Sequence, residues 1–177
     1  MSRPSTRLVP EPGYTPLVGA LVAMLGYARA TTLAAVDGLT PTDLVHRYDA
    51  KANSIGALLA HVATTEWYYL TTTLGRREPT GAEWADWGAT LQLGPTAEAA
   101  VQGRELPWFV ERLQTVRART LDALRGVDDA WLSAEFELPW LAQPATNHWA
   151  WFHVAEDELN HRGQIRWLRS RLPSVVG

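Results

Sequence analysis

Apolar side chains recur every three or four residues along four long stretches of the chain, the spacing of a helix that buries one face. The four predicted helices cover about residues 14–36, 53–74, 108–125 and 147–172. Asn53 or Ser54 is a suitable N-cap for the second helix. Gly126 ends the third helix, and Pro173 ends the fourth. Because no stretch alternates convincingly with period two, the sequence predicts an all-α four-helix bundle.

The first predicted helix carries two adjacent apolar stripes. The stripe expected on the buried face consists of Leu17, Leu21, Met24 and Ala28, with Val18, Val22 and Leu25 beside it. In the second predicted helix, we expect Glu66 and Trp67 to lie in the core or at an interface.

The segments between these helices differ in length and composition. Residues 1–13 contain three prolines and predict an irregular arm, and residues 39–44 predict a short helical turn capped by Thr40. Residues 127–146 predict a mixed loop. The connection over residues 75–107 is long, with one short helix expected near residues 95–102. Long connections in compact domains are usually functional, and this one allows the second and third helices to run in the same direction.

Composition narrows the classes of function. The chain has 177 residues, 46% of them hydrophobic, which predicts one domain over residues 1–177. Its net charge of −3 gives no electrostatic reason to expect nucleic acid as a partner. We expect no apolar run long enough to cross a membrane and no signal sequence, so the predicted location is the cytoplasm. The absence of cysteine excludes disulfides and thiolate ligands, and the nine tryptophans suit a cavity lining or a homodimer interface.

The fourth helix carries polar residues in the middle of its apolar stripe. The stripe consists of Ala150, Val154, Asp157, His161, Ile165, Leu168 and Leu172. Buried carboxylate and imidazole groups need partners. The spacing of four residues puts Asp157 and His161 on adjacent turns, where they could chelate zinc or another divalent metal. His153 lies one turn earlier, and the distance along the helix is too long for all three residues to bind one ion. The pair is either His153 and Asp157 or Asp157 and His161, and we favour the second.

A third ligand must come from another helix, and His61 in the second helix is the best candidate. Three ligands would leave a coordination position open, as in catalytic metal sites. Structural interpretations stand beside this one: Asp157 with His161 as a local ion pair, and His61 as a hydrogen-bonded core residue. Glu156 and Glu158 are expected on solvated faces or in contact with Arg162 and Arg166, and close helix packing is the simplest explanation for Gly163.

Two segments resemble a known group of proteins. The run HVAEDELNHRGQIRWLR, residues 153–169, resembles the signature helix of the DinB-like superfamily, and NSIGALLAHVATTEWYYL, residues 53–70, resembles its second-helix signature. This resemblance implies an up–down–down–up four-helix bundle. It also implies a divalent metal, zinc or nickel, held by His61, Asp157 and His161. Characterised members include S-transferases and isomerases that use mycothiol, bacillithiol or glutathione.

The leading hypothesis is therefore a metal-dependent transferase that joins a low-molecular-weight thiol, mycothiol or bacillithiol, to an electrophilic small molecule. His153 would be a catalytic base or would contact the substrate. A second hypothesis is a metal-dependent hydrolase that uses water as the nucleophile. A third is a non-enzymatic stress-response or ligand-binding bundle with a vestigial site.

Overall fold

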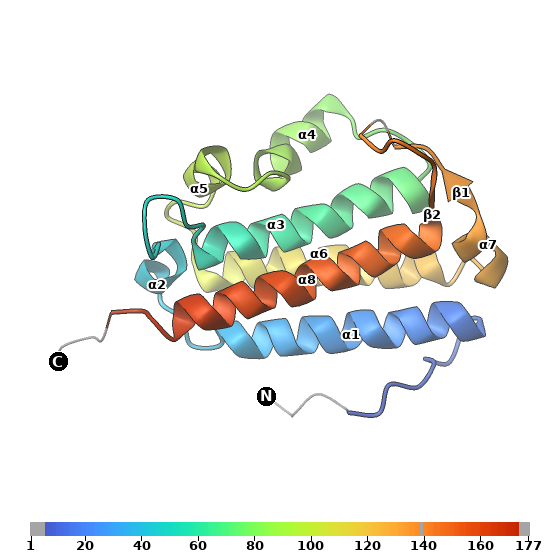
Figure 1. Cartoon of the computed structure of the whole chain (residues 1–177), viewed down its shortest axis with the longest axis horizontal. Coiled ribbons are helices and arrows are strands. Elements are labelled where there is room, and N and C mark those ends of the chain that lie inside the picture. Colours follow the sequence, from blue (N-terminus) through green and yellow to red (C-terminus); the bar gives the residue numbers. More distant parts are fainter. Residues whose placement is uncertain (1–5, 139, 174–177) are drawn as a thin grey trace.

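The computed structural model describes residues 6–138 and 140–173, and the fold is mostly helical (Figure 1). The long helices are α1 (Pro16–Val36), α3 (Ile55–Tyr69), α6 (Leu106–Leu124) and α8 (Asn147–Arg169). Their positions agree with the four predicted segments to within a few residues. Residues 6–13 form the irregular arm that was expected, whereas residues 1–5 of that prediction lie outside the described part.

The four long helices lie side by side along the long axis of the molecule (Figure 1). Helices α3 and α6 run in one direction, and α1 and α8 run in the other. Helix α8 packs against both α1 and α3, and α3 also packs against α6. The seam between α3 and α8 therefore joins the two segments that carry the candidate ligands.

Helix α3 begins and ends with side chains that satisfy backbone groups. The Ser54 hydroxyl accepts a hydrogen bond from the Ala57 N–H at its first turn. After Tyr69 the helix widens into a π-helical turn, η1 (Leu70–Leu74). There, threonine hydroxyls donate to carbonyl oxygens four residues earlier, for example Thr71 to Trp67 at 2.9 Å. Such back-bonding is common where a helix departs from ideal geometry.

The long connection folds over the outer side of α3 (Figure 1). It contains α4 (Gly81–Trp87), a short 3₁₀ turn η2 (Gly88–Thr90) and α5 (Pro95–Ala100). Helix α5 is the short helix that was predicted, whereas α4 was not predicted. Its capping box of Thr80 and Glu83 was the signal available in the sequence. Trp87 stacks on Trp67 of α3 with ring centroids 5.5 Å apart, so the connection is packed onto the helix.

The remaining segments are short. Helix α2 (Pro41–Val45) has the predicted Thr40 cap, completed by Asp43 as a capping box. The predicted mixed loop contains α7 (Asp129–Ser133) and two strands, β1 (Glu135–Phe136) and β2 (Ala145–Thr146). The strands pair antiparallel with Glu135 opposite Thr146. Two residues per strand are too few for a period-two pattern to be visible in the sequence.

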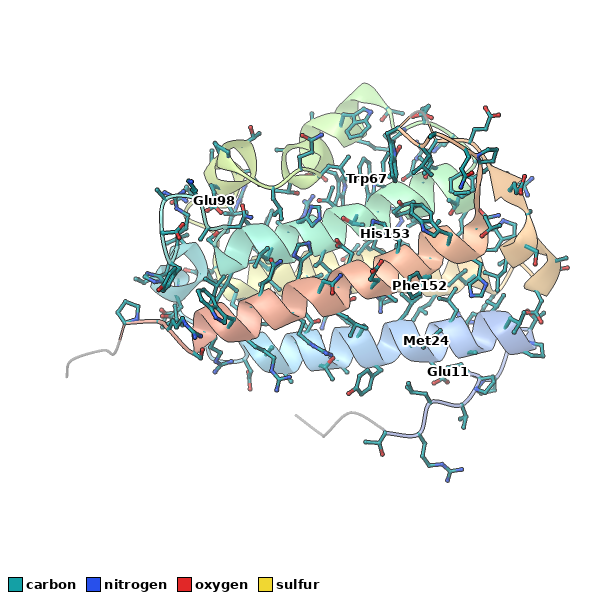
Figure 2. The ribbon with its side chains drawn as sticks, viewed as in Figure 1. Glu11, Met24, Trp67, Glu98, Phe152 and His153 are labelled. Atoms are coloured by element: carbon teal, nitrogen blue, oxygen red, sulfur yellow. The ribbon has the colours of Figure 1, made fainter. Side chains whose placement is uncertain are left out.

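The buried face of α1 differs from the predicted one. Leu21 and Ala28 are buried as expected, but Leu17 is 53% exposed and Met24 is 41% exposed. Figure 2 shows Met24 on α1. The buried face instead includes Val18 and Leu25, and it continues to the polar residues Arg29 and Thr32 of the same helix. A pattern of apolar residues alone does not follow a buried face that includes polar positions.

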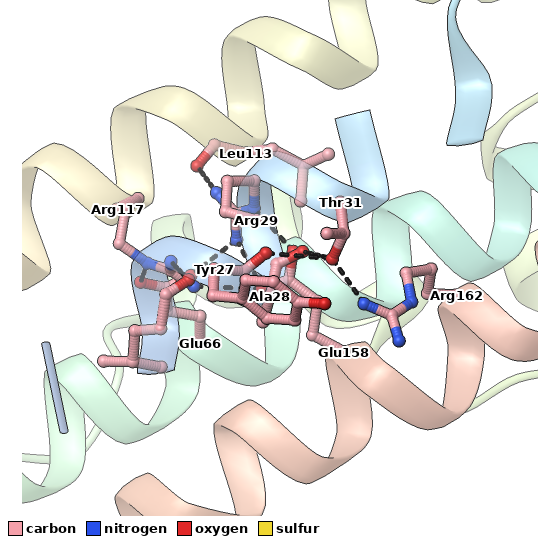
Figure 3. Close-up of polar contacts among 10 residues, drawn as sticks. Tyr27, Ala28, Arg29, Thr31, Glu66, Leu113, Arg117, Glu158 and Arg162 are labelled. Carbon is pink, nitrogen blue, oxygen red and sulfur yellow. Dashed lines mark hydrogen bonds and ion pairs between the residues drawn. The ribbon is translucent and has the colours of Figure 1, made fainter. Parts of the chain in front are cut away.

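Those polar positions lead to a buried charge cluster, which we call the ionic core: Arg29, Glu66, Arg117 and Glu158 (Figure 3). Arg29 Nε donates to Glu158 Oε1 at 2.8 Å, and Arg117 Nε donates to Glu66 Oε1 at 2.7 Å. Arg29 also reaches Glu66, and Arg117 also reaches Glu158. The expectation that Glu158 lies on a solvated face or contacts Arg162 was wrong, because its side chain is fully buried between the two arginines.

Pairing outweighs burial in setting the pKa values of the ionic core. Burial alone would raise the pKa of Glu66, but the charges of Arg117 and Arg29 hold that pKa below its ordinary value. Burial would likewise lower the pKa of Arg117, and the two glutamates raise it instead. The two arginines and two glutamates therefore form a charge-balanced group that links α1, α3, α6 and α8.

Helix α1 also departs from one expectation made on composition. By length and composition alone it could cross a membrane, although no apolar run was expected to be long enough. Half of its most apolar window is buried inside the fold, against α8 among other elements. Helix α1 also supplies Arg29 to the ionic core, so it takes part in the buried interior of this fold.

Candidate metal centre

Three of the predicted site residues lie together at the seam between α3 and α8. His61 comes from the middle of α3, and Asp157 and His161 come from adjacent turns of α8. Asp157 Oδ1 lies 3.2 Å from His161 Nε2 and 3.6 Å from His61 Nε2. One ligand atom from each residue lies within 4.8 Å of the others. All three side chains are between 11% and 14% exposed, so the group is shielded but reachable.

Hydrogen bonds on the far side of each ring orient the two imidazoles. His61 Nδ1 lies 3.1 Å from the carbonyl oxygen of Thr90, in the long connection. His161 Nδ1 lies 3.1 Å from Gln164 Oε1, one turn further along α8. With Nδ1 protonated in each ring, both Nε2 atoms present a lone pair toward Asp157. This arrangement, in which a hydrogen bond fixes the tautomer, is typical of metal-binding histidines.

The donor set and its spacing fit a divalent first-row metal. Two donors bound to zinc at about 2.1 Å in tetrahedral geometry are separated by about 3.4 Å. The two separations from Asp157, 3.2 and 3.6 Å, lie on either side of that value, and the two imidazole donors lie within 4.8 Å of each other. Asp157 Oδ2 is buried with no hydrogen-bond partner among the residues that the structure describes. A buried carboxylate oxygen without a partner is costly, and a cation at this position would relieve that cost.

The electrostatics of the three residues are tightly coupled. Burial alone would raise the pKa of Asp157, but hydrogen bonds from His161 and His61, formed when Nε2 of each ring carries a proton, hold that pKa well below its ordinary value. Burial would lower the pKa of His161, yet the hydrogen bond to Asp157 raises it. The site therefore favours an ionised carboxylate and stabilises positive charge beside it, whether that charge is a proton or a metal ion.

His153 does not belong to this group of three. Its ring stacks on Trp149 with centroids 5.3 Å apart and meets the edge of Tyr69 at 5.9 Å. Its Nδ1 lies 3.4 Å from the exposed carboxylate of Glu156. Figure 2 shows His153 on α8, on the side that faces α3. Of the two predicted pairs, the structure brings Asp157 and His161 together with His61.

Sequence reasoning missed three contributors to the site. Thr90 left no signal, because its carbonyl reaches His61 only through the fold of the long connection. Gln164 was visible as the residue three positions after His161, which is within contact distance on a helix. Tyr69 is buried, and its hydroxyl has no hydrogen-bond partner in the described part of the chain. Burial and then the charges of Tyr68 and Asp157 raise the pKa of Tyr69, so its hydroxyl stays protonated.

The fold and the site together define a class: a helical protein with a His–Asp–His group, able to hold a divalent metal, at the seam of two long helices. The family model for mycothiol S-transferases matches residues 20–173. The chain therefore belongs to the mycothiol S-transferase family, which is DinB-like.

Solved structures support the fold. A conserved protein from Enterococcus faecalis is 19% identical with a TM-score of 0.66, covering 84% of this chain and 92% of that one. A DinB-like protein from Bacillus cereus ATCC 10987 is 16% identical with a TM-score of 0.62, covering 88% of this chain and 95% of that one. A search of curated proteins gave no match. The resemblance to the DinB-like superfamily is thus confirmed.

Proposed function

We propose that this protein is a metal-dependent S-transferase that joins a low-molecular-weight thiol to an electrophilic small molecule. The observation that carries the proposal is the convergence of His61 Nε2, Asp157 Oδ1 and His161 Nε2, with ligand atoms within 4.8 Å of one another. Membership of the mycothiol S-transferase family supports mycothiol as the thiol. Since the chain has no cysteine, the reacting sulfur has to come from a second molecule.

In this proposal, His61, Asp157 and His161 hold the ion. A bound divalent metal lowers the pKa of a thiol or water beside it and so makes a nucleophile at neutral pH. The Thr90 carbonyl and the Gln164 side chain keep the two imidazoles turned so that Nε2 faces the ion. Two histidines and one aspartate make a donor set of net charge −1. One divalent ion would therefore leave the centre with a single positive charge.

Two further residues have proposed roles beside the centre. The Tyr69 hydroxyl is protonated and without a partner in the described chain, so it can donate a hydrogen bond to an oxygen of the electrophile. His153, which contacts the Tyr69 ring, is the proposed base that accepts the thiol proton. The side chain of His153 is 34% exposed, so it can exchange that proton with solvent.

The remaining predictions belong to the same proposal. The directions of the four long helices support an up–down–down–up bundle that forms one domain. Zinc or nickel as the ion, a small-molecule substrate, a homodimer and a cytoplasmic location stay predictions.

The proposal is tested by metal analysis and by activity. Protein purified without chelator should contain close to one divalent ion per chain, and His161→Ala should contain much less. His148→Ala is the matched control, because His148 lies on the same helix, is exposed and is outside the site. The metal-loaded protein should consume mycothiol with 1-chloro-2,4-dinitrobenzene as the electrophile, and His161→Ala should not. Metal-free wild type with no thiol consumption after zinc or nickel addition would refute the proposal.

A second candidate function rests on the 3.2 Å contact between Asp157 and His161. With His161 protonated, this contact is a buried ion pair, and the protein would be a non-enzymatic ligand-binding or stress-response module. That alternative predicts a melting temperature that does not change when zinc is added. The S-transferase proposal predicts an increase, because a ligand that binds only the folded state stabilises it.

A further inference from the structure

Gly163 lies inside α8 without a packing reason. Glycine in a helix interior destabilises the helix relative to alanine. A Cβ added to Gly163 would meet no heavy atom within 4 Å among the described residues. The expectation that close helix packing explains this glycine was therefore wrong. The space in front of Gly163 is open, so a glycine that destabilises the helix needs an explanation other than close packing.

That open space is part of a surface cavity of about 550 Å³ between α8 and the segment that leads into α3, with Leu58 of α3 in its lining. The cavity lies one helical turn from the candidate metal centre on both helices. Leu58 in its lining precedes His61 by three residues on α3, and Gln164 in its lining follows His161 by three residues on α8. Since the two helices run in opposite directions, both displacements point the same way along the seam. The volume is in the range of small-molecule sites.

The lining of this cavity is rich in amides and poor in charge. Asn53, Asn160 and Gln164 supply three side-chain amides, and among the described lining residues only Lys51 is charged. The Gln164 amide oxygen is used by His161, which leaves its NH₂ group to donate. Trp167 is 43% exposed; Tyr48 contacts its edge at 4.8 Å between centroids, and the Arg171 guanidinium lies over one face at 4.1 Å from the ring centroid, which leaves the other face for a ligand. Amides that donate and accept, beside an aromatic face, suit a ring that carries many hydroxyl groups.

We infer that this cavity binds the uncharged, hydroxyl-rich part of the thiol co-substrate, and that Gly163 is glycine so that this part can lie against α8. The inference rests on the proposed S-transferase function and adds to it the place and the chemistry of thiol recognition. One helical turn, about 5.4 Å, separates the cavity from the metal ligands, a distance that the cysteinyl arm of mycothiol can bridge. A thiol with several carboxylates, such as bacillithiol or glutathione, would need more cations than Lys51 alone.

The test compares two glycines that differ only in location. Gly26 in α1 is exposed, and a Cβ there also meets nothing within 4 Å in the described part of the chain. Gly163→Ala and Gly26→Ala should both raise the melting temperature, by about 2–4 °C. In zinc-loaded protein, Gly163→Ala should weaken mycothiol binding about tenfold by calorimetry, and Gly26→Ala should leave the Kd within twofold. Gly163→Leu, whose side chain favours the helix about as well as alanine does and fills more of the cavity, should abolish mycothiol binding.

Each other result has a defined meaning. Wild-type mycothiol affinity in Gly163→Ala and Gly163→Leu would overturn the inference, while turnover by the wild type would leave the S-transferase function standing. A loss of zinc in Gly163→Ala would assign the effect to the metal centre and also overturn it. Tighter binding of bacillithiol or glutathione than of mycothiol would overturn the stated ligand chemistry. Zinc-loaded wild type that neither binds nor consumes any of the three thiols would refute the proposed function, and this inference with it.

Discussion

Removing one carboxylate from the ionic core should destabilise the protein strongly. In Glu158→Gln, the group keeps both arginine charges but only one carboxylate, Glu66, to balance them. Glu158 accepts hydrogen bonds from Arg29 at 2.8 Å and from Arg117 at 3.0 Å, and its side chain is fully buried. Breaking a buried ion pair from one side costs about 3–5 kcal/mol. For a chain of this size, that loss lowers the melting temperature by about 6–20 °C.

The free energy of unfolding is measured by urea denaturation at neutral pH. Glu156→Gln is the matched control, because it makes the same chemical change two residues away, on a side chain that is 46% exposed. Its expected effect is within about 0.5 kcal/mol. A loss below about 1 kcal/mol in Glu158→Gln would refute the view that the four charges act as a balanced buried group.

Charge balance itself is tested with a double variant. Glu66→Leu combined with Arg117→Met removes one positive and one negative group and leaves Arg29 paired with Glu158. The double variant should lose less stability than the sum of the two single variants, because neither remaining charge is left without a partner. Additive losses would mean that the pairing contributes little and that packing alone decides the cost.

Zinc added to metal-free protein should raise the melting temperature of the wild type but not of His61→Ala, as measured by differential scanning fluorimetry. Gly56→Ala should lose about 1–3 kcal/mol in urea denaturation, because its Cβ would lie 3.0 Å from the Phe109 ring, whereas Gly26→Ala should gain stability. The charges around Glu66 lower its pKa below 4.5 in the folded state, so its contribution is complete above the unfolded pKa and is lost as the pH falls through the folded pKa. The stability difference between wild type and Glu66→Gln should therefore narrow below about pH 4.5, and an unchanged difference at pH 3 would contradict this pairing.

The sequence predicted the features of the fold that depend on residue spacing within one helix. The stripe of α8 placed Asp157 and His161 correctly on one side, and the caps at Thr40 and Ser54 are where they were expected. His61 was predicted as the partner of Asp157 and His161 from its position in an apolar segment and from the family resemblance, and it lies 3.6 Å from Asp157. These features depend on local spacing, which a sequence records directly.

The parts that were missed depend on contacts between helices. Glu158 was predicted to face solvent or to contact Arg162 and Arg166, because nothing in α8 alone shows that Arg29 and Arg117 enclose it from α1 and α6. The role of Thr90 was invisible for the same reason, since its carbonyl meets a ring 29 positions earlier in the chain. A helical pattern predicts which face of a helix is buried. It does not predict which polar group of a neighbouring helix contacts that face.

Through the contact between Thr90 and His61, the long connection helps to determine the geometry of the candidate metal centre. Removing η2 while keeping enough chain to run back from the end of α3 to the start of α6 (Figure 1) would take away the carbonyl that sets the tautomer of His61. If the proposed metal centre is correct, changes in length around η2 should alter its affinity for the ion although they leave His61, Asp157 and His161 in place. The orientation of an imidazole on one long helix is thus decided by a segment outside the bundle of long helices.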